Sequence, residues 1–205
     1  DLQEIDIFHN STDPSNILTT QVFSNDRYRR MYVAHMRTIL NEKFTNNYYT
    51  SQALDLQSVI DNYVSSDPNT FFSYADFTNN INNSVSNIIG ISELMTSRIS
   101  YLQALNQFTA IPPEVNNIIT NPMNVLPHTT VNITTEITNT DYAYLGYRFK
   151  FSDKFKKLQM FDDGLNGDGS AGDGVYGVTI DVDARDIQYY IYAENTEAGI
   201  FSPER

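Results

Sequence analysis

Residues 105–119, LNQFTAIPPEVNNII, contain a change in the spacing of the apolar residues. Two consecutive prolines, Pro112 and Pro113, cannot continue a helix and favour an extended connection. Before them, apolar residues recur at every third or fourth position, as on an amphipathic helix. After them, apolar residues recur at every second position, as on a half-buried strand. The chain is therefore expected to change from helices to sheet here.

The residues before the prolines predict a helical subdomain that spans residues 1–111. The clearest pattern covers residues 25–45, where Ser24 or Asn25 can cap the helix. Further helical patterns occur at residues 56–64, 74–81 and 91–108. The apolar stripe of the second pattern consists of Leu56, Val59, Ile60, Tyr63 and Val64, and Asp67-Pro68 ends it.

Residues 112–205 predict an all-β domain. Alternating apolar residues predict strands at residues 131–137, 145–151, 176–182 and 188–193, with shorter strands at 115–119 and 156–160. Six or seven strands in roughly 95 residues is the density of a β-sandwich. The chain lacks cysteine and tryptophan, which excludes an antibody-type core but fits a fibronectin-like or generic immunoglobulin-like sandwich. The expected fold class is α+β, as two domains.

Composition and charge exclude several classes of partner and of functional site. The net charge of -12 repels polyanions, so nucleic acid is not expected as a partner. No apolar run approaches the roughly 20 residues of a membrane-spanning helix. Without cysteine the chain has no disulfide, thiolate metal site or cysteine nucleophile. Because the first residue is Asp1 rather than methionine, we expect a processed product or a fragment of a longer protein.

The run FDDGLNGDGSAGDGVYG at residues 161–177 holds four aspartates and six glycines between two predicted strands. Turn formation is the first interpretation, because glycine tolerates positive φ and aspartate bonds to nearby backbone. Calcium binding is the second, with oxygen ligands from Asp162, Asn166, Asp168 and Asp173. The match to a calcium loop is defective, because Gly164 occupies the third position and an aspartate the twelfth.

Other polar residues have structural interpretations. Arg98 lies in line with the apolar seam of its helix and is expected to pair with a carboxylate or helix carbonyls, or to reach water. His35 is expected to be a hydrogen-bonded residue at a helix boundary. No catalytic motif occurs, so no catalytic or cofactor-binding residue is assigned. The first long helix carries a basic face, expected to be solvated or to meet acidic groups of a neighbouring domain: Arg27, Arg29, Arg30 and Arg37.

Two groups of segments resemble a known family. The runs VFSNDRYRRMYVAHMRTILNEKF (22–44), SDPN (66–69) and ISELMTSRISYL (91–102) resemble the C-terminal helical end of bacterial spore-coat-protein-H (CotH) kinase-family proteins. The runs MFDDGLNGDGSAGDGVYGVTI (160–180), IQYYIYAEN (187–195) and SPER (202–205) are similar to the β-sandwich domain that often follows such kinases in secreted bacterial proteins.

The resemblance implies an atypical kinase-like fold whose ATP and divalent metal are bound upstream of this helical end. No residue of the chain matches those nucleotide-binding or catalytic segments, so ATP and metal are expected only with the upstream part present. The residues that correspond to the family's helical pattern, and should pack against or anchor the kinase lobe, are Tyr28, Tyr32, Arg37 and Arg98.

The leading hypothesis is a non-catalytic C-terminal part of a secreted CotH-kinase-like protein, in which the sandwich has an interaction or spacer role. Its partner is the upstream kinase-like domain, and its location is the exterior or cell surface of a bacterium, or the periplasm. The alternative is a surface module that binds a glycan or a protein, stabilised by calcium at the Asp-Gly loop. Its binding surface would be formed by exposed tyrosines: Tyr142, Tyr144, Tyr190 and Tyr192. An independent enzyme is the third class, and the parent protein's own kinase activity stays open.

Overall fold

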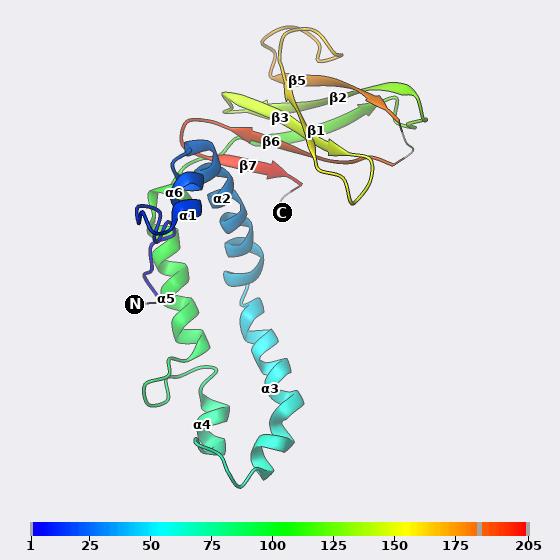
Figure 1. The fold of residues 1–205 in the computed structure, drawn as a ribbon. Helices are drawn as coiled ribbons and strands as arrows, with labels where there is room; N and C mark the ends of the chain where they lie inside the picture. Colours follow the sequence, from blue (N-terminus) through cyan, green and yellow to red (C-terminus); the bar gives the residue numbers. More distant parts are fainter. Residues whose placement is uncertain (1, 184–185, 204–205) are drawn as a thin grey trace. The chain divides into compact units, whose positions relative to one another are not determined.

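The computed structural model in Figure 1 describes residues 2–183 and 186–203. It has helices in the N-terminal part and two antiparallel sheets in the C-terminal part, which confirms the expected α+β layout. None of the helices in these described residues is long and apolar enough to cross a bilayer.

The chain divides into two compact units. The helical unit consists of the residues up to Ser24 together with Met36–Thr109. The sandwich unit consists of Asn25–His35 and the residues from Ala110 onward. The change at the prolines therefore coincides with the start of the sheet residues. However, the first half of the predicted long helix groups with the sheets and not with the other helices.

The helices from residue 26 onward follow the expected patterns, with local differences at their ends, whereas the helix Ile17–Phe23 was not predicted. Asn25 caps α2, because its Oδ1 accepts the backbone N–H groups of Arg27 at 3.0 Å and Tyr28 at 3.3 Å. The pattern at residues 91–108 forms two helices, since Leu105 is extended with ψ of 139°. The bounds are α1 Ile17–Phe23, α2 Asp26–Ile39, η1 Leu40–Phe44 (a π-helix), α3 Tyr48–Ser66, α4 Tyr74–Asn79, α5 Ile91–Ala104 and α6 Asn106–Thr109.

The helical unit has a small apolar interior. Among its described residues, the buried apolar side chains are Ile7, Leu40, Ile81 and Leu102. Arg98 lies beside this interior and donates to the backbone carbonyls of Gln3 and Ile5. Arg98 therefore pairs with backbone carbonyls of the N-terminal segment and not with a carboxylate.

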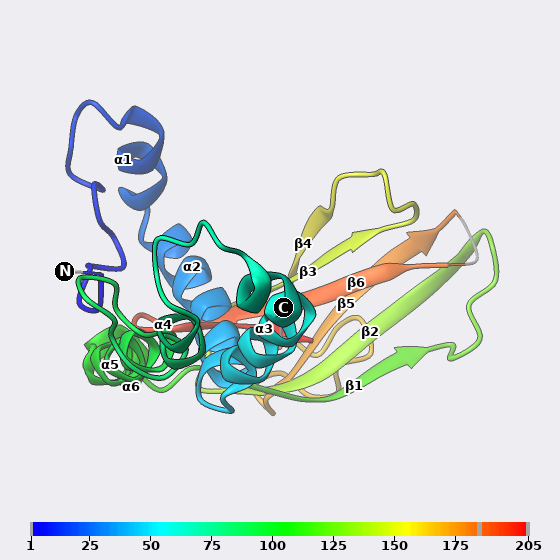
Figure 2. The same ribbon diagram turned by 90° about the horizontal axis from the view of Figure 1, so that it is seen from below.

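The sandwich unit contains two antiparallel sheets, one with strand order β1-β2-β5 and the other β4-β3-β6-β7 (Figure 2). This matches the immunoglobulin- or fibronectin-like sandwich expected from the strand pattern. One strand, β7, was not predicted, and β3 ends before Phe149 and Phe151. The bounds are β1 Glu114–Asn121, β2 Thr129–Thr138, β3 Tyr142–Arg148, β4 Lys156–Met160, β5 Val175–Val182, β6 Gln188–Glu194 and β7 Gly199–Ser202.

The main core lies between the two sheets. Val131 and Ile133 of β2 are fully buried against Leu145 of β3 and Ile191 of β6. Thr135 lies on the same inward-facing side of β2 and is also buried. Its hydroxyl group is satisfied there because it donates to the carbonyl of Asn116 at 2.6 Å. That carbonyl lies at a β-bulge between Asn116 and Ile119, so the threonine supplies the partner that the interrupted ladder lacks.

The other face of the four-stranded sheet is covered by the first half of α2. Tyr144 of β3 and Tyr192 of β6 form a second buried cluster with Phe201 of β7 and Ala34 of α2. β3 is consequently buried on both faces. The aromatic rings are in contact, with centroids 5.3 Å apart for Tyr144 and Tyr192 and 4.8 Å apart for Tyr192 and Phe201.

Candidate functional site

The Asp-Gly loop is organised by hydrogen bonds from its own backbone to its carboxylates. Asp162 accepts three N–H groups: Gly172 at 2.7 Å and Asp173 at 3.2 Å on Oδ1, and Gly174 at 2.9 Å on Oδ2. Asp173 accepts from Ser170 and Val175, and these backbone hydrogen bonds lower the pKa of its carboxyl group. The loop therefore uses these carboxylates to close turns.

Asp168 has a different environment from its neighbours. Only 1% of this residue is exposed. Its Oδ2 accepts the N–H groups of Asp163 at 3.0 Å and Gly164 at 3.1 Å, whereas its Oδ1 is buried without a hydrogen-bond partner in the described part of the chain. Gly177 makes room for it, since a Cβ at that position would lie 2.9 Å from the Cβ of Asp168.

Asn166, the remaining candidate calcium ligand, has φ of 57° and accepts from the Thr179 hydroxyl at 2.7 Å. Five glycines of the same loop adopt positive φ values between 79° and 94°, as turn formation requires. Across residues 2–183 and 186–203, no group of three or more histidine, aspartate or glutamate side chains is arranged to hold a metal ion. Calcium binding at this loop stays a prediction.

Two of the four tyrosines expected to form an exposed binding surface, Tyr144 and Tyr192, are buried under α2 instead. Tyr144 is 2% exposed and Tyr192 is fully buried, while Tyr142 and Tyr190 are half-buried at the margin of the same cluster. Burial raises the pKa of both Tyr144 and Tyr192. These two rings are therefore not accessible to a glycan, because a helix occupies the face that the strand pattern alone leaves open.

A buried carboxylate joins α2 to this tyrosine cluster. Glu194, whose side chain is 4% exposed, receives Arg27 Nε on Oε1 at 2.6 Å and Arg30 Nε on Oε2 at 2.9 Å. The Tyr192 hydroxyl donates to Oε2 at 2.9 Å. The Arg27 guanidinium also lies 4.0 Å from the ring centroid of Tyr142. Two of the predicted basic residues thus meet an acidic group within the sandwich unit.

Electrostatics explain why this carboxylate stays charged. Burial alone would raise the pKa of Glu194, but the hydrogen bonds from Arg30, Arg27 and Tyr192 outweigh it and lower the pKa below its ordinary value of 4.5. Nothing in the sequence around Glu194 marks it. The detectable signal lies on α2, where two arginines three residues apart share one helix face.

The remaining polar predictions lie elsewhere. Arg37 belongs to the helical unit and donates to the carbonyl of Gln107 at 2.7 Å. His35 stacks on Phe201, with ring centroids 4.4 Å apart.

The helical unit exposes the apolar stripe of α3. Leu56, Val59 and Tyr63 are 67%, 71% and 78% exposed. α3 instead packs on α4 with polar groups: Gln57 Nε2 donates to the carbonyl of Phe77 at 2.7 Å, and Asp61 accepts from the Tyr74 hydroxyl at 2.7 Å. An apolar stripe shows which side of a helix needs a partner and not whether one is present.

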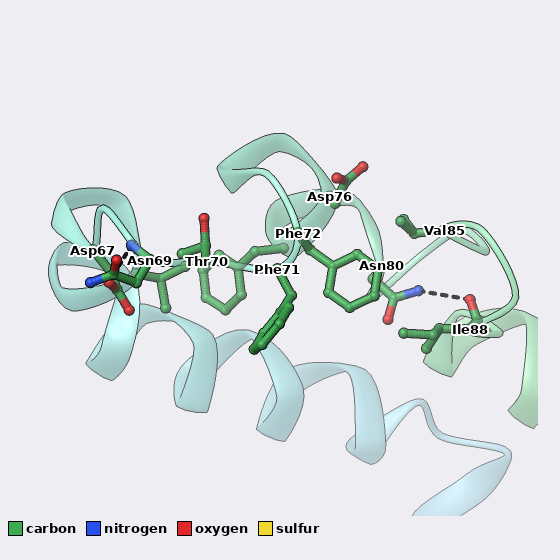
Figure 3. A pocket seen from close by; sticks show the side chains of 11 residues that line it. Asp67, Asn69, Thr70, Phe71, Phe72, Asp76, Asn80, Val85 and Ile88 are labelled. Carbon is green, nitrogen blue, oxygen red and sulfur yellow. Dashed lines mark hydrogen bonds between the residues drawn. The ribbon is translucent and has the colours of Figure 1, made fainter.

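A pocket of about 540 Å³ lies at the C-terminal end of α3 (Figure 3). It is lined by aromatic and aliphatic side chains, including Phe71, which is fully exposed, and Phe72. Val64, the last residue of the predicted stripe, also lines it. The side chain of Asn80 closes one end by donating to the carbonyl of Ile88 at 3.1 Å.

Comparison with known proteins adds no assignment. No model of a known protein family matches the chain, and no curated protein matches it either.

Proposed function

We propose that this chain is a non-catalytic part of a secreted CotH-kinase-like protein. In this proposal the helical unit docks on an upstream kinase-like domain through the α3 stripe, and the sandwich unit has an interaction or spacer role outside the bacterial cell. ATP and a divalent metal belong to the upstream domain.

The observation that carries the proposal is the exposed stripe of α3. Burying a leucine or valine side chain is worth about 1.5–3 kcal/mol, so several of them on one helix face favour a partner surface. Leu56, Val59 and Tyr63 form a continuous line at helical spacing. Val64, the last residue of the stripe, lines the pocket at the end of the helix together with the exposed Phe71.

The polar clusters also support a non-catalytic role. The carboxylate of Asp162 accepts three backbone N–H groups, and that of Glu194 is held by two arginines and a tyrosine. Such groups stabilise turns and packing. A general base instead needs a lone pair directed at a substrate.

Dye binding tests the docking surface. The chain should bind an apolar fluorescent dye strongly or self-associate, and the double variant Leu56→Gln/Val59→Gln should lose most of this signal without a fall in unfolding temperature. The matched control is Ile119→Gln/Leu126→Gln, which removes two exposed aliphatic side chains from the sandwich unit.

Three outcomes would count against the proposal. The first is a monomeric chain that binds no dye, and the second is equal loss of signal in the two double variants. The third is ATP hydrolysis or peptide phosphorylation by the chain itself, which would instead identify an enzyme.

A further inference from the structure

The β3–β4 hairpin concentrates the positive charge of an acidic protein. Residues 148–157, RFKFSDKFKK, contain Arg148 and four of the five lysines in the whole chain, with one acidic residue. The net charge of the protein is -12. A hairpin with this composition creates a local positive potential on an otherwise acidic protein.

Three of these lysines share a pocket. A cavity of about 430 Å³ on the sandwich unit is lined by Lys150, Lys154 and Lys156 together with Arg148 and Phe149. None of the three lysines forms an ion pair with any described residue. Like charges grouped in this way repel one another, and a bound anion would relieve the repulsion. The volume lies within the range of small-ligand sites, which is about 300–1,000 Å³.

Arg148 is held in a fixed orientation within this group. Its guanidinium lies 4.7 Å from the ring centroid of Phe151 and 4.4 Å from that of Phe155. Nε donates to Gln188 Oε1 at 2.8 Å, and Nη1 donates to the carbonyl of Asp153 at 3.4 Å. A guanidinium fixed in this way is prepared for planar recognition of a carboxylate, with little further loss of side-chain entropy.

The other groups around the pocket favour a carbohydrate with spaced charges. Phe151 is 81% exposed and offers a flat apolar face next to the cations. Asp153 and Asp183 also line the pocket, where ionised carboxylates can accept hydrogen bonds from hydroxyl groups. The same two carboxylates disfavour a polyanion of much higher charge density, such as double-stranded DNA, which carries one negative charge per about 1.7 Å of helix axis.

We propose that the β3–β4 hairpin pocket binds an anionic polysaccharide that carries carboxylate groups, as uronic acid residues do. Arg148 and the three lysines bind the carboxylates, and Phe151 packs on a sugar ring. The inference rests on the interaction role proposed for the sandwich unit. It does not involve the α3 stripe, so loss of polysaccharide binding and loss of dye binding are separate results.

Biosensor titration of the whole chain on immobilised polygalacturonate tests this proposal. We expect saturable binding at low salt that weakens by about tenfold or more as the salt screens the charges. The double variant Lys150→Gln/Lys154→Gln should bind about tenfold more weakly. Phe151→Ala should bind several-fold more weakly at unchanged net charge. The control is Lys43→Gln, which removes the one lysine outside the hairpin and should bind within about twofold of the unchanged chain.

Each alternative outcome is decisive. Absence of binding to polygalacturonate at low salt would overturn the proposal. Equal weakening in Lys43→Gln and Lys154→Gln single variants would indicate a net-charge effect without a site. Equal binding to neutral dextran would show that the cationic side chains do not contribute to polysaccharide binding. Tighter binding to single-stranded DNA or polyphosphate than to polygalacturonate would assign the pocket to a different class of polymer.

Discussion

Glu194 is the residue on which the contact between α2 and the four-stranded sheet depends most. We predict that Glu194→Gln lowers the free energy of unfolding by about 2–3 kcal/mol, because two arginines lose a charged, buried acceptor. The side chain of Arg27 is 40% exposed and can be solvated by water when the charge is removed. The loss of stability is therefore smaller than for an ion pair in which both partners are buried. Denaturant unfolding measures the difference. Glu197→Gln, at an exposed site nearby, should stay within about 0.5 kcal/mol of the unchanged chain.

The same residue sets a pH dependence. Because the pKa of Glu194 is lowered in the folded state, its contribution is complete above the ordinary value of 4.5 and is lost as pH falls through the folded-state pKa. The stability difference between the unchanged chain and Glu194→Gln should therefore be constant near neutral pH and shrink below about pH 4.5. A difference that persists unchanged in acid would show that the charge on Glu194 is not what stabilises the contact.

The calcium prediction for the Asp-Gly loop also concerns single residues. If calcium binds, millimolar calcium should raise the unfolding temperature and magnesium should not, since a ligand of the folded state stabilises it by mass action. Asp168→Asn should abolish the shift, because Asp168 has the buried oxygen without a partner. Asp163→Asn is the control, as its exposed carboxylate accepts from Leu165. Equal unfolding temperatures in calcium and in chelator would leave turn formation as the loop's role.

The pairing of β3 with β6 places a glycine of one strand against a tyrosine ring of the other. Gly146 faces Tyr190 in the register, and a Cβ on Gly146 would lie 2.3 Å from the Tyr190 ring. We predict that Gly146→Ala destabilises the sandwich unit by about 1–3 kcal/mol, because Tyr190 is held by Phe155 and Phe201 and cannot move freely. Thermal unfolding checks this. The variant Gly146→Ala/Tyr190→Ala should recover part of the loss if the clash is its cause.

The helices show what an apolar repeat in the sequence predicts and what it does not. The positions of α2, α3, α4 and α5 follow from the apolar spacing, the Asn25 cap and the stop at Asp67-Pro68. Their partners do not follow from it. The stripe of α2 contributes Met31 to the sheet face, where it packs against the tyrosine cluster, whereas the stripe of α3 is exposed. Both stripes have the same spacing, so only the tertiary contacts distinguish them.

The division of the whole molecule leads to a further prediction. Asn25–His35 belongs to the sandwich unit, so a protein cut at the expected boundary and consisting of residues 112–205 would uncover the cluster of Tyr144, Tyr192 and Phe201. We expect this fragment to bind apolar dye and to unfold at a lower temperature than the full chain. Addition of a peptide spanning residues 25–37 should reduce the dye signal. A fragment as stable as the full chain would show that α2 is not needed to cover the sheet.

The sequence alone determines the local structure, because helix and strand periods, caps and turn residues act over a few positions. It predicts the change near Pro112, six of the seven strands and the turn chemistry of the Asp-Gly loop. The tertiary structure decides which faces are covered. Glu194 is paired with arginines more than 160 positions away in the sequence, and two of the four tyrosines predicted to be exposed, Tyr144 and Tyr192, are buried under the same helix. Such contacts depend on how separate elements pack, and no local pattern records that packing.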